Sequence, residues 1–217
     1  MPKETFFNLP TKKRELFVET ALKEFALHSY ETASISNVIR EMGIAKGSLY
    51  QYFGNKKELY FYLIEHATEK KLKATQEYGS SNGSLDFFTW FRKSQVESLL
   101  FDLANPVEGL LLQNVSREVH NADIGNLALA SKQEAISSYK NILKQHYNAG
   151  SLGTKPNYIA LSFVLVQTGL GLLDLMEMQF DFSMRTLVKE NKKLELDPNE
   201  VKKIVKKIVK NIQLNFA

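Results

Sequence analysis

One short segment, AKGSLYQYF at residues 45–53, combines small, basic, hydroxyl and amide side chains, and a further lysine follows it. The residues of interest are Lys46, Gly47, Ser48, Tyr50, Gln51, Tyr52 and Lys56. A lysine can reach a guanine edge or a phosphate, and hydroxyl and amide groups can bond both phosphates and base edges. Gly47 lets the backbone approach a ligand closely, although glycine weakens a helix by about 1 kcal/mol relative to alanine. This chemistry suits contact with a DNA duplex.

Two short helices joined by a tight turn are predicted to position these side chains. The Ser34 hydroxyl can cap the first helix, and Gly43 occupies the favoured place for a left-handed residue at its end. The apolar side of the first helix consists of Ile35, Val38, Ile39 and Met42. The residues expected to face inward from the second helix are Ala45, Leu49 and Phe53. A three-helix packing unit with a polar surface would show the same pattern, so spacing alone leaves both readings open.

The whole chain has the pattern of an all-α protein. Helical spacing recurs throughout, and four of the five prolines stand where helices should begin. We expect about nine helices, at 10–28, 34–42, 46–53, 55–78, 84–103, 106–120, 124–148, 156–180 and 198–215. The apolar window at 158–178 contains polar and charged residues, so we interpret it as a buried helix and not as a membrane span.

Residues 12–60 resemble the DNA-binding domain of the tetracycline-repressor (TetR) family of bacterial regulators. Phe25, Tyr30, the segment GIAKGSLYQYF and the segment NKKEL shortly after it carry the resemblance. One departure is Ser29, because the family usually has glycine before the tyrosine. If that position is left-handed, serine costs about 1–2 kcal/mol.

The resemblance implies that the second helix of the pair enters the major groove. Lys46, Gly47 and Ser48 would then lie nearest the bases. The residues expected to hold the DNA backbone are Tyr50, Gln51, Tyr52 and Lys56, joined from the preceding helix by Ser34, Ser36 and Asn37. Such a short helix reads few base pairs, so a dimer on a near-palindromic operator is expected.

The chain is expected to contain two functional segments. Residues 1–56 would form the helix-turn-helix domain and 57–217 the effector-binding and dimerisation domain, with helix 55–78 connecting them. The clearest break is the GSSNGS run at 79–84.

By the same resemblance, helices 156–180 and 198–215 would form a four-helix bundle with a second subunit. The residues assigned to this interface are Leu161, Leu165, Gly169, Leu172, Val201, Ile204, Val205 and Ile208. The last helix is also basic and amphipathic, which would suit an anionic membrane surface. It lacks large anchoring side chains until Phe216, so we favour packing against helices and expect no membrane contact.

The family resemblance also suggests a small-molecule pocket in the C-terminal segment. Its candidate lining residues are Phe88, Phe91, Gln113, Asn114, Phe163, Gln167 and Met176. A mainly apolar cavity with a few polar groups would fit a hydrophobic effector. Aromatic residues at helical spacing also form solid cores, so this alternative stays open.

Composition argues against other classes of function. The chain has no cysteine, which excludes disulfides and thiolate metal sites and fits a cytoplasmic location. The four histidines are scattered, and no catalytic or phosphate-binding motif occurs. We therefore expect no enzyme activity, no cofactor and no metal. The net charge of +4 at pH 7 is mildly basic, with basic ends and an acidic middle.

The sequence thus predicts a homodimeric, effector-responsive DNA-binding regulator, most simply a repressor. In the mechanism that the family resemblance implies, ligand in the C-terminal segment would move helix 55–78 and change the separation of the two recognition helices. Two alternatives remain: a constitutive DNA-binding protein with a filled core, and an interaction module whose helix-turn-helix no longer binds DNA.

Overall fold

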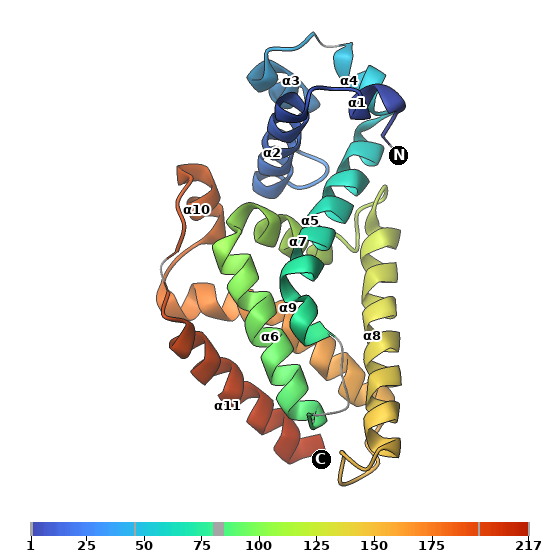
Figure 1. Cartoon of the computed structure of the whole chain (residues 1–217), viewed down its shortest axis with the longest axis vertical. Coiled ribbons are helices and arrows are strands. Elements are labelled where there is room, and N and C mark those ends of the chain that lie inside the picture. The colour runs from blue at the N-terminus through green and yellow to red at the C-terminus, as the bar shows by residue number, and fades with distance from the viewer. Residues whose placement is uncertain (1, 46, 80–84, 195, 217) are drawn as a thin grey trace. The chain divides into compact units, whose positions relative to one another are not determined.

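The structure is a computed structural model that describes residues 2–45, 47–79, 85–194 and 196–216. The described residues form helices, turns and loops, with no strand among them. In chain order the helices are α1 (Glu4–Phe7), α2 (Thr11–Leu27), α3 (Ile35–Met42), α4 (Ser48–Tyr52), α5 (Lys56–Gly79), α6 (Phe87–Ala104), α7 (Pro106–Arg117), α8 (Gly125–Asn148), α9 (Tyr158–Phe180), α10 (Met184–Glu190) and α11 (Pro198–Phe216). Figure 1 shows them along the chain.

The nine expected helices are present, and the all-α prediction is confirmed. Two short helices escaped prediction. One, α1, precedes Pro10, and the other, α10, follows α9 after a left-handed Asp181. Four and seven residues, respectively, are too few for a periodic pattern to appear.

Contacts divide the described chain into two compact units that interleave in sequence. The first comprises 1–70, 105–128 and 184–192, and the second comprises 71–104, 129–183 and 193–217. Hence α7 and α10 group with the N-terminal helices, although they follow the proposed boundary at residue 57. The break expected at 79–84 lies almost entirely outside the described residues.

The first unit is built around aromatic side chains from its N-terminal helices. Phe6 of α1 is fully buried, with its ring within 6.1 Å of those of Phe17, Tyr52, Phe53 and Tyr62. Deeper along α2, the Phe25 ring lies 5.1 Å from that of Tyr60 on α5. Edge-to-face and tilted aromatic pairs of this kind fix the angles between helices.

The second unit is built around α6. In Figure 1, α11 runs alongside α6, and the contacts between them agree; α9 also packs on α6. The buried stripe of α11 consists of Val201, Val205, Val209 and Ile212. The face of α6 that it helps to cover is rich in buried aromatic and aliphatic residues.

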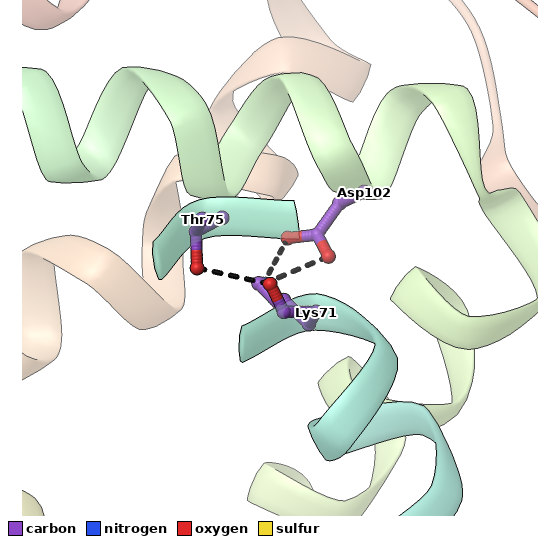
Figure 2. A network of polar contacts seen from close by, with 3 residues as sticks. All are labelled: Lys71, Thr75 and Asp102. Carbon is purple, nitrogen blue, oxygen red and sulfur yellow. Dashed lines mark hydrogen bonds and ion pairs between the residues drawn. The ribbon is translucent and has the colours of Figure 1, made fainter. Parts of the chain in front are cut away.

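One ion pair is enclosed within the second unit (Figure 2). The Lys71 ammonium donates to both carboxylate oxygens of Asp102, at 2.8 and 2.7 Å, and the Thr75 hydroxyl donates to the Lys71 carbonyl at 2.9 Å. Burial raises the pKa of Asp102, and the Lys71 charge opposes this shift. Lys71 therefore favours the ionised form of a carboxyl group whose charge burial disfavours.

Candidate nucleic-acid interface

The first helix of the predicted pair forms as its sequence requires. The Ser34 hydroxyl accepts a hydrogen bond from the Asn37 amide at 3.3 Å and so caps α3. Gly43 follows the last turn with φ 62°, in the left-handed region, and its amide closes the helix on Arg40. Both terminal signals identified in the sequence are confirmed.

Ser29, the one departure from the family pattern, causes no backbone strain. It is not among the described residues with positive φ. Its hydroxyl lies 2.9 Å from the Thr32 hydroxyl and accepts the Thr32 amide at 3.3 Å. Serine therefore stabilises the turn by a local hydrogen bond.

The second helix of the pair, α4, is held from behind by the N-terminal residues. The Lys3 ammonium donates to the Tyr50 carbonyl at 2.7 Å, and the Lys3 amide donates to the Tyr52 carbonyl at 2.8 Å. The Thr5 hydroxyl donates to the Gln51 carbonyl. Carbonyls at a helix C-terminus lack intrahelical partners and carry partial negative charge, so a lysine there satisfies both needs. No pattern in the sequence predicts this contact.

The outer side of α4 carries most of the predicted DNA-contact residues. Gly47, Tyr50 and Gln51 are exposed, and Ser48 is half-buried. Tyr50 is 55% exposed, and its backbone is fixed by the contact with Lys3. Lys46 lies outside the described residues. A fixed backbone with exposed polar side chains is the arrangement that reading a duplex requires.

Two of the orientations predicted for this region are wrong. Tyr52 is buried, 8% exposed, with its ring 6.0 Å from that of Phe17, because Phe6 and Phe17 close over the inner side of α4. Tyr52 therefore belongs to the core. Ala45, expected to face inward, is exposed; Leu49 and Phe53 are buried as expected.

Lys56 is engaged within the fold. Its ammonium donates to the Glu31 carbonyl at 3.1 Å and lies 5.0 Å from the centre of the Tyr30 ring. Burial lowers the pKa of Lys56, while carboxylates, Glu118 foremost, oppose that shift. Lys56 thus holds the loop before α3. The prediction that Lys56 contacts the DNA backbone did not include this role.

The three predicted DNA-contact residues at the start of α3 differ in the hydrogen bonds that they make within the domain. Ser36 is exposed. The Ser34 amide donates to Glu24 at 2.6 Å while its hydroxyl caps the helix. The Asn37 side chain accepts from Arg40 at 3.0 Å and donates to Glu24 at 3.5 Å. Ser34 and Asn37 therefore position α3 through contacts inside the domain.

Three side chains hold the end of α2 and the chain segment after it. They come from α7, from the residue that follows α7, and from α10. Asn114 donates to the Ala26 carbonyl at 2.8 Å, and the Tyr30 amide donates to Glu118 at 2.8 Å. Arg185 donates to the Leu27 carbonyl. This places Asn114, expected in a ligand pocket, against the helix-turn-helix domain instead.

The seven predicted pocket residues are not brought together within one unit. Gln113 and Asn114 belong to the first unit, and the other five belong to the second. Phe88, Phe91 and Met176 are buried, whereas Phe163 and Gln167 are exposed. Phe163 and Met176 fall on different sides of α9, as their spacing along a helix of 3.6 residues per turn requires.

Most residues assigned to a dimer interface are packed inside this chain. Five of the eight are buried: Leu161, Leu165, Leu172, Val201 and Val205. Gly169 has intermediate exposure, and a Cβ there would lie 2.8 Å from the Gln95 side chain, so this glycine permits close packing of α9 on α6. Ile204 and Ile208 are half-buried. Within the chain, α11 and α9 both pack on α6, which covers much of these apolar stripes.

The opposite side of α9 is apolar and uncovered in the single chain. Its exposed large residues are Ile159, Phe163 and Met178, with Gln167 and Gly171 also exposed. By length and composition α9 could cross a membrane, a test that core helices of soluble proteins also pass. Only 39% of its most apolar window is buried, so the prediction of a buried helix holds for one side of α9.

No group of three or more histidine, aspartate or glutamate residues that could hold a metal ion occurs in the described parts of the chain.

Sequence comparison places the match on the helix-turn-helix region. Residues 17–63 match the family model described as bacterial regulatory proteins, tetR family. An uncharacterised HTH-type transcriptional regulator of Bacillus subtilis, YuxN, is 36% identical over 59 residues, 27% of this chain and 20% of that protein. The HTH-type transcriptional repressor AcnR of Corynebacterium glutamicum is 29% identical over 70 residues, 32% of this chain and 37% of that protein. The chain thus spans about a fifth and somewhat over a third of these relatives.

Structural similarity extends over the whole chain. A TetR family transcriptional regulator from Chloroflexus aurantiacus superposes with a TM-score of 0.81 at 26% identity, covering 100% of this chain and 98% of the other. A TetR-like transcriptional regulator from Rhodococcus has the same fold at a TM-score of 0.65 and 16% identity, covering 93% and 96%. Residues 17–63 are thus similar to the helix-turn-helix region of the TetR family of bacterial regulatory proteins, and the fold of the chain is similar to that of a TetR family transcriptional regulator.

Proposed function

We propose that this protein regulates transcription as a homodimer that binds a near-palindromic DNA operator through α4 and the start of α3. The observation that carries the proposal is the outer side of α4. Gly47, Tyr50 and Gln51 are exposed there on a backbone fixed by Lys3, in a domain of a regulator family. Ser48, Ser36 and the lysine at position 46 would complete the contacting set.

Gly47 supports the proposal because the fold of this chain does not require a glycine there. Its backbone is right-handed helical, with φ −71°, and a Cβ would meet nothing within 4 Å. An alanine would therefore fit the free protein. The missing side chain is best explained by a partner that approaches the backbone closely, as a DNA backbone or base edge would.

Gly47→Ala tests this proposal. The variant should keep the free energy of unfolding within about 1 kcal/mol of the parent protein and should bind its operator at least about tenfold more weakly. Fluorescence anisotropy on a duplex selected from a random pool measures the affinity.

Gly43→Ala is the matched control, because Gly43 has φ 62° and alanine there is strained. It should lose about 1 kcal/mol of stability. Unchanged operator affinity in a folded Gly47→Ala protein would contradict the close approach.

The proposed dimer uses the uncovered side of α9. Ile159, Phe163 and Met178 lie about one helical turn or a multiple apart and are exposed. A contiguous apolar strip of this kind is a typical protein interface. The half-buried Ile204 and Ile208 of α11 are retained as flanking contacts. Two copies would present their recognition helices to half-sites about one helical turn apart.

The proposed output is repression that a small, mainly hydrophobic effector releases. Two buried ring nitrogens of the second unit support an internal polar ligand contact, since Trp90 Nε1 and His146 Nε2 lack hydrogen-bond partners among the described atoms. The two rings lie 6.4 Å apart. Buried polar atoms without partners are rare and mark sites where a ligand or water belongs.

A constitutive DNA-binding protein is the second candidate, and one observation favours it. Phe88, Phe91 and Met176 are buried as closely as ordinary core residues. A screen of apolar compounds for loss of operator binding separates the two candidates. Release of the operator by any compound supports the effector-responsive repressor, and operator binding that no compound changes supports the constitutive DNA-binding protein.

A further inference from the structure

A cavity opens between α6 and α11 in the second unit. Its volume is about 350 Å³, within the range of small-molecule sites, which is roughly 300–1,000 Å³. The lining residues are Arg92, Lys93, Val96, Glu97, Lys202 and Lys206. We call this the α6–α11 groove. None of the residues predicted to form an effector pocket lines it.

The groove gathers four cations around one carboxylate. Lys202 and Lys206 are one helical turn apart on α11, and Arg92 and Lys93 are adjacent on α6. None of these four takes part in a hydrogen bond or ion pair recorded among the described residues. Two other lysines of the second unit do have carboxylate partners. The Lys203 ammonium lies 3.7 Å from a carboxylate oxygen of Glu200, and the Lys71 ammonium lies 2.7 Å from one of Asp102. Four positive charges held together with a single carboxylate among them leave an excess of positive charge, which favours an anion.

We propose that the α6–α11 groove is a binding site for a small organic phosphate. Guanidinium and ammonium groups converging from two helices are the donors that phosphate oxygens prefer. Val96 is buried and supplies an apolar floor for a carbon skeleton. Glu97 adds one acceptor beside the cations, which suits a ligand that carries hydroxyl groups next to its phosphates.

This site is separate from the proposed DNA contacts. The groove lies in the second unit, whereas α3 and α4 lie in the first. The helix-turn-helix surface could also attract polyanions, so binding alone does not identify the groove. Variants of α11 make that distinction.

The experiment is calorimetric titration of the full-length protein with pyrophosphate, a sugar bisphosphate and the unphosphorylated sugar. The groove variant is Lys202→Gln with Lys206→Gln. The matched control, Lys207→Gln with Lys210→Gln, removes the same charge from exposed positions of the same helix outside the groove. All four lysines are exposed, so both variants should fold, which circular dichroism and thermal unfolding check.

The parent protein and the control should bind the sugar bisphosphate saturably, at one site per chain, and more tightly than pyrophosphate. The unphosphorylated sugar should not bind. The groove variant should lose at least about tenfold in affinity, because two charge-assisted contacts are removed. The bisphosphate should also raise the melting temperature of the parent protein and not that of the groove variant.

Equal affinity in the two variants would overturn the proposal, because binding would then lie elsewhere, for example on the helix-turn-helix. Absence of saturable binding, or tighter binding of pyrophosphate than of the sugar bisphosphate, would also overturn it. Operator affinity is measured on the same proteins, so a failure of DNA binding is recognised separately and leaves the groove assignment untouched.

Discussion

At the scale of single residues, two tyrosines of α4 stand two positions apart in opposite surroundings. Tyr50 is 55% exposed and Tyr52 is 8% exposed. Tyr50→Ala should therefore weaken operator binding by about tenfold, or about 1.4 kcal/mol, with little change in stability. Tyr52→Ala should instead lose about 3 kcal/mol of unfolding free energy, since it empties space among Phe6 and Phe17.

Anisotropy titrations and urea unfolding of both variants check this pair. A folded Tyr50→Ala protein with parental operator affinity would refute the assigned face. A Tyr52→Ala protein that is as stable as the parent would refute the burial of that ring.

The sequence predicted the capping residues of α3 but not the surroundings of each polar side chain. Ser34 and Gly43 act locally, so neighbouring positions suffice to assign them. The engagement of Lys56 depends on Glu31 and Tyr30, which are more than 20 residues away along the chain. Pattern and spacing carry no information on such contacts.

At the scale of secondary-structure elements, α1 explains how a five-residue recognition helix is kept in place. So short a helix is marginal alone. Contacts from Lys3 and Thr5 to the carbonyls of Tyr50, Gln51 and Tyr52 stabilise its C-terminal end. The Phe6–Phe7 pair before Pro10 was the one signal in the sequence for this element, and four residues are too few to show a helical period.

The ion pair between Lys71 of α5 and Asp102 of α6, drawn in Figure 2, leads to a testable prediction. Asp102→Ala should lower the unfolding free energy by about 2 kcal/mol, because Lys71 loses both of its charge-assisted hydrogen bonds. Asp102→Asn should lose less, since it keeps one acceptor. Chemical denaturation measures both.

Glu190→Gln is the control, because its partner Lys192 is largely exposed. That variant should change the unfolding free energy by less than about 1 kcal/mol. Equal effects of Asp102→Ala and Glu190→Gln would show that the enclosed pair is not stabilising.

The apolar stripes of α9 and α11 show where the limit of sequence-based prediction lies. Their periodicity identified five positions that are buried and three of intermediate exposure. It did not say whether α6 or a second copy covers them, because the same side chains serve either contact. The sequence thus predicted the elements well and their partners poorly.

At the scale of the whole molecule, the proposed recognition of an operator depends on the proposed dimer. Phe163→Glu places a charge on the uncovered side of α9 and should convert the dimer to monomers at micromolar concentration. Leu16→Glu is the matched control, since Leu16 lies on α2 and is 52% exposed against 51% for Phe163. Light scattering coupled to size exclusion measures the masses.

Monomers in both variants would point to general misfolding, and a dimeric Phe163→Glu protein would contradict the α9 interface. Deletion of 198–217 is a poor test of the dimer, because α11 covers α6 within the chain and its loss should unfold the second unit.

The division into two compact units suggests which helices would couple effector binding to DNA binding. Helix α5 begins in the first unit and continues in the second. Asn114 of α7 bonds the end of α2, and Glu118, which follows α7, bonds the amide of Tyr30 after α2. We propose that α7, together with α5, couples effector binding to the helix-turn-helix. The sequence suggested α5 alone for this role, because the hydrogen bonds of Asn114 and Glu118 join residues 88 positions apart and no local pattern indicates them.

The most direct test of the account is selection of bound duplexes from a random DNA pool by the purified protein at two salt concentrations. We expect an enriched near-palindrome with half-sites about one helical turn apart, and an affinity that falls steeply as salt rises. No enriched sequence, or binding that does not depend on salt, would contradict the proposal that this protein reads an operator as a dimer.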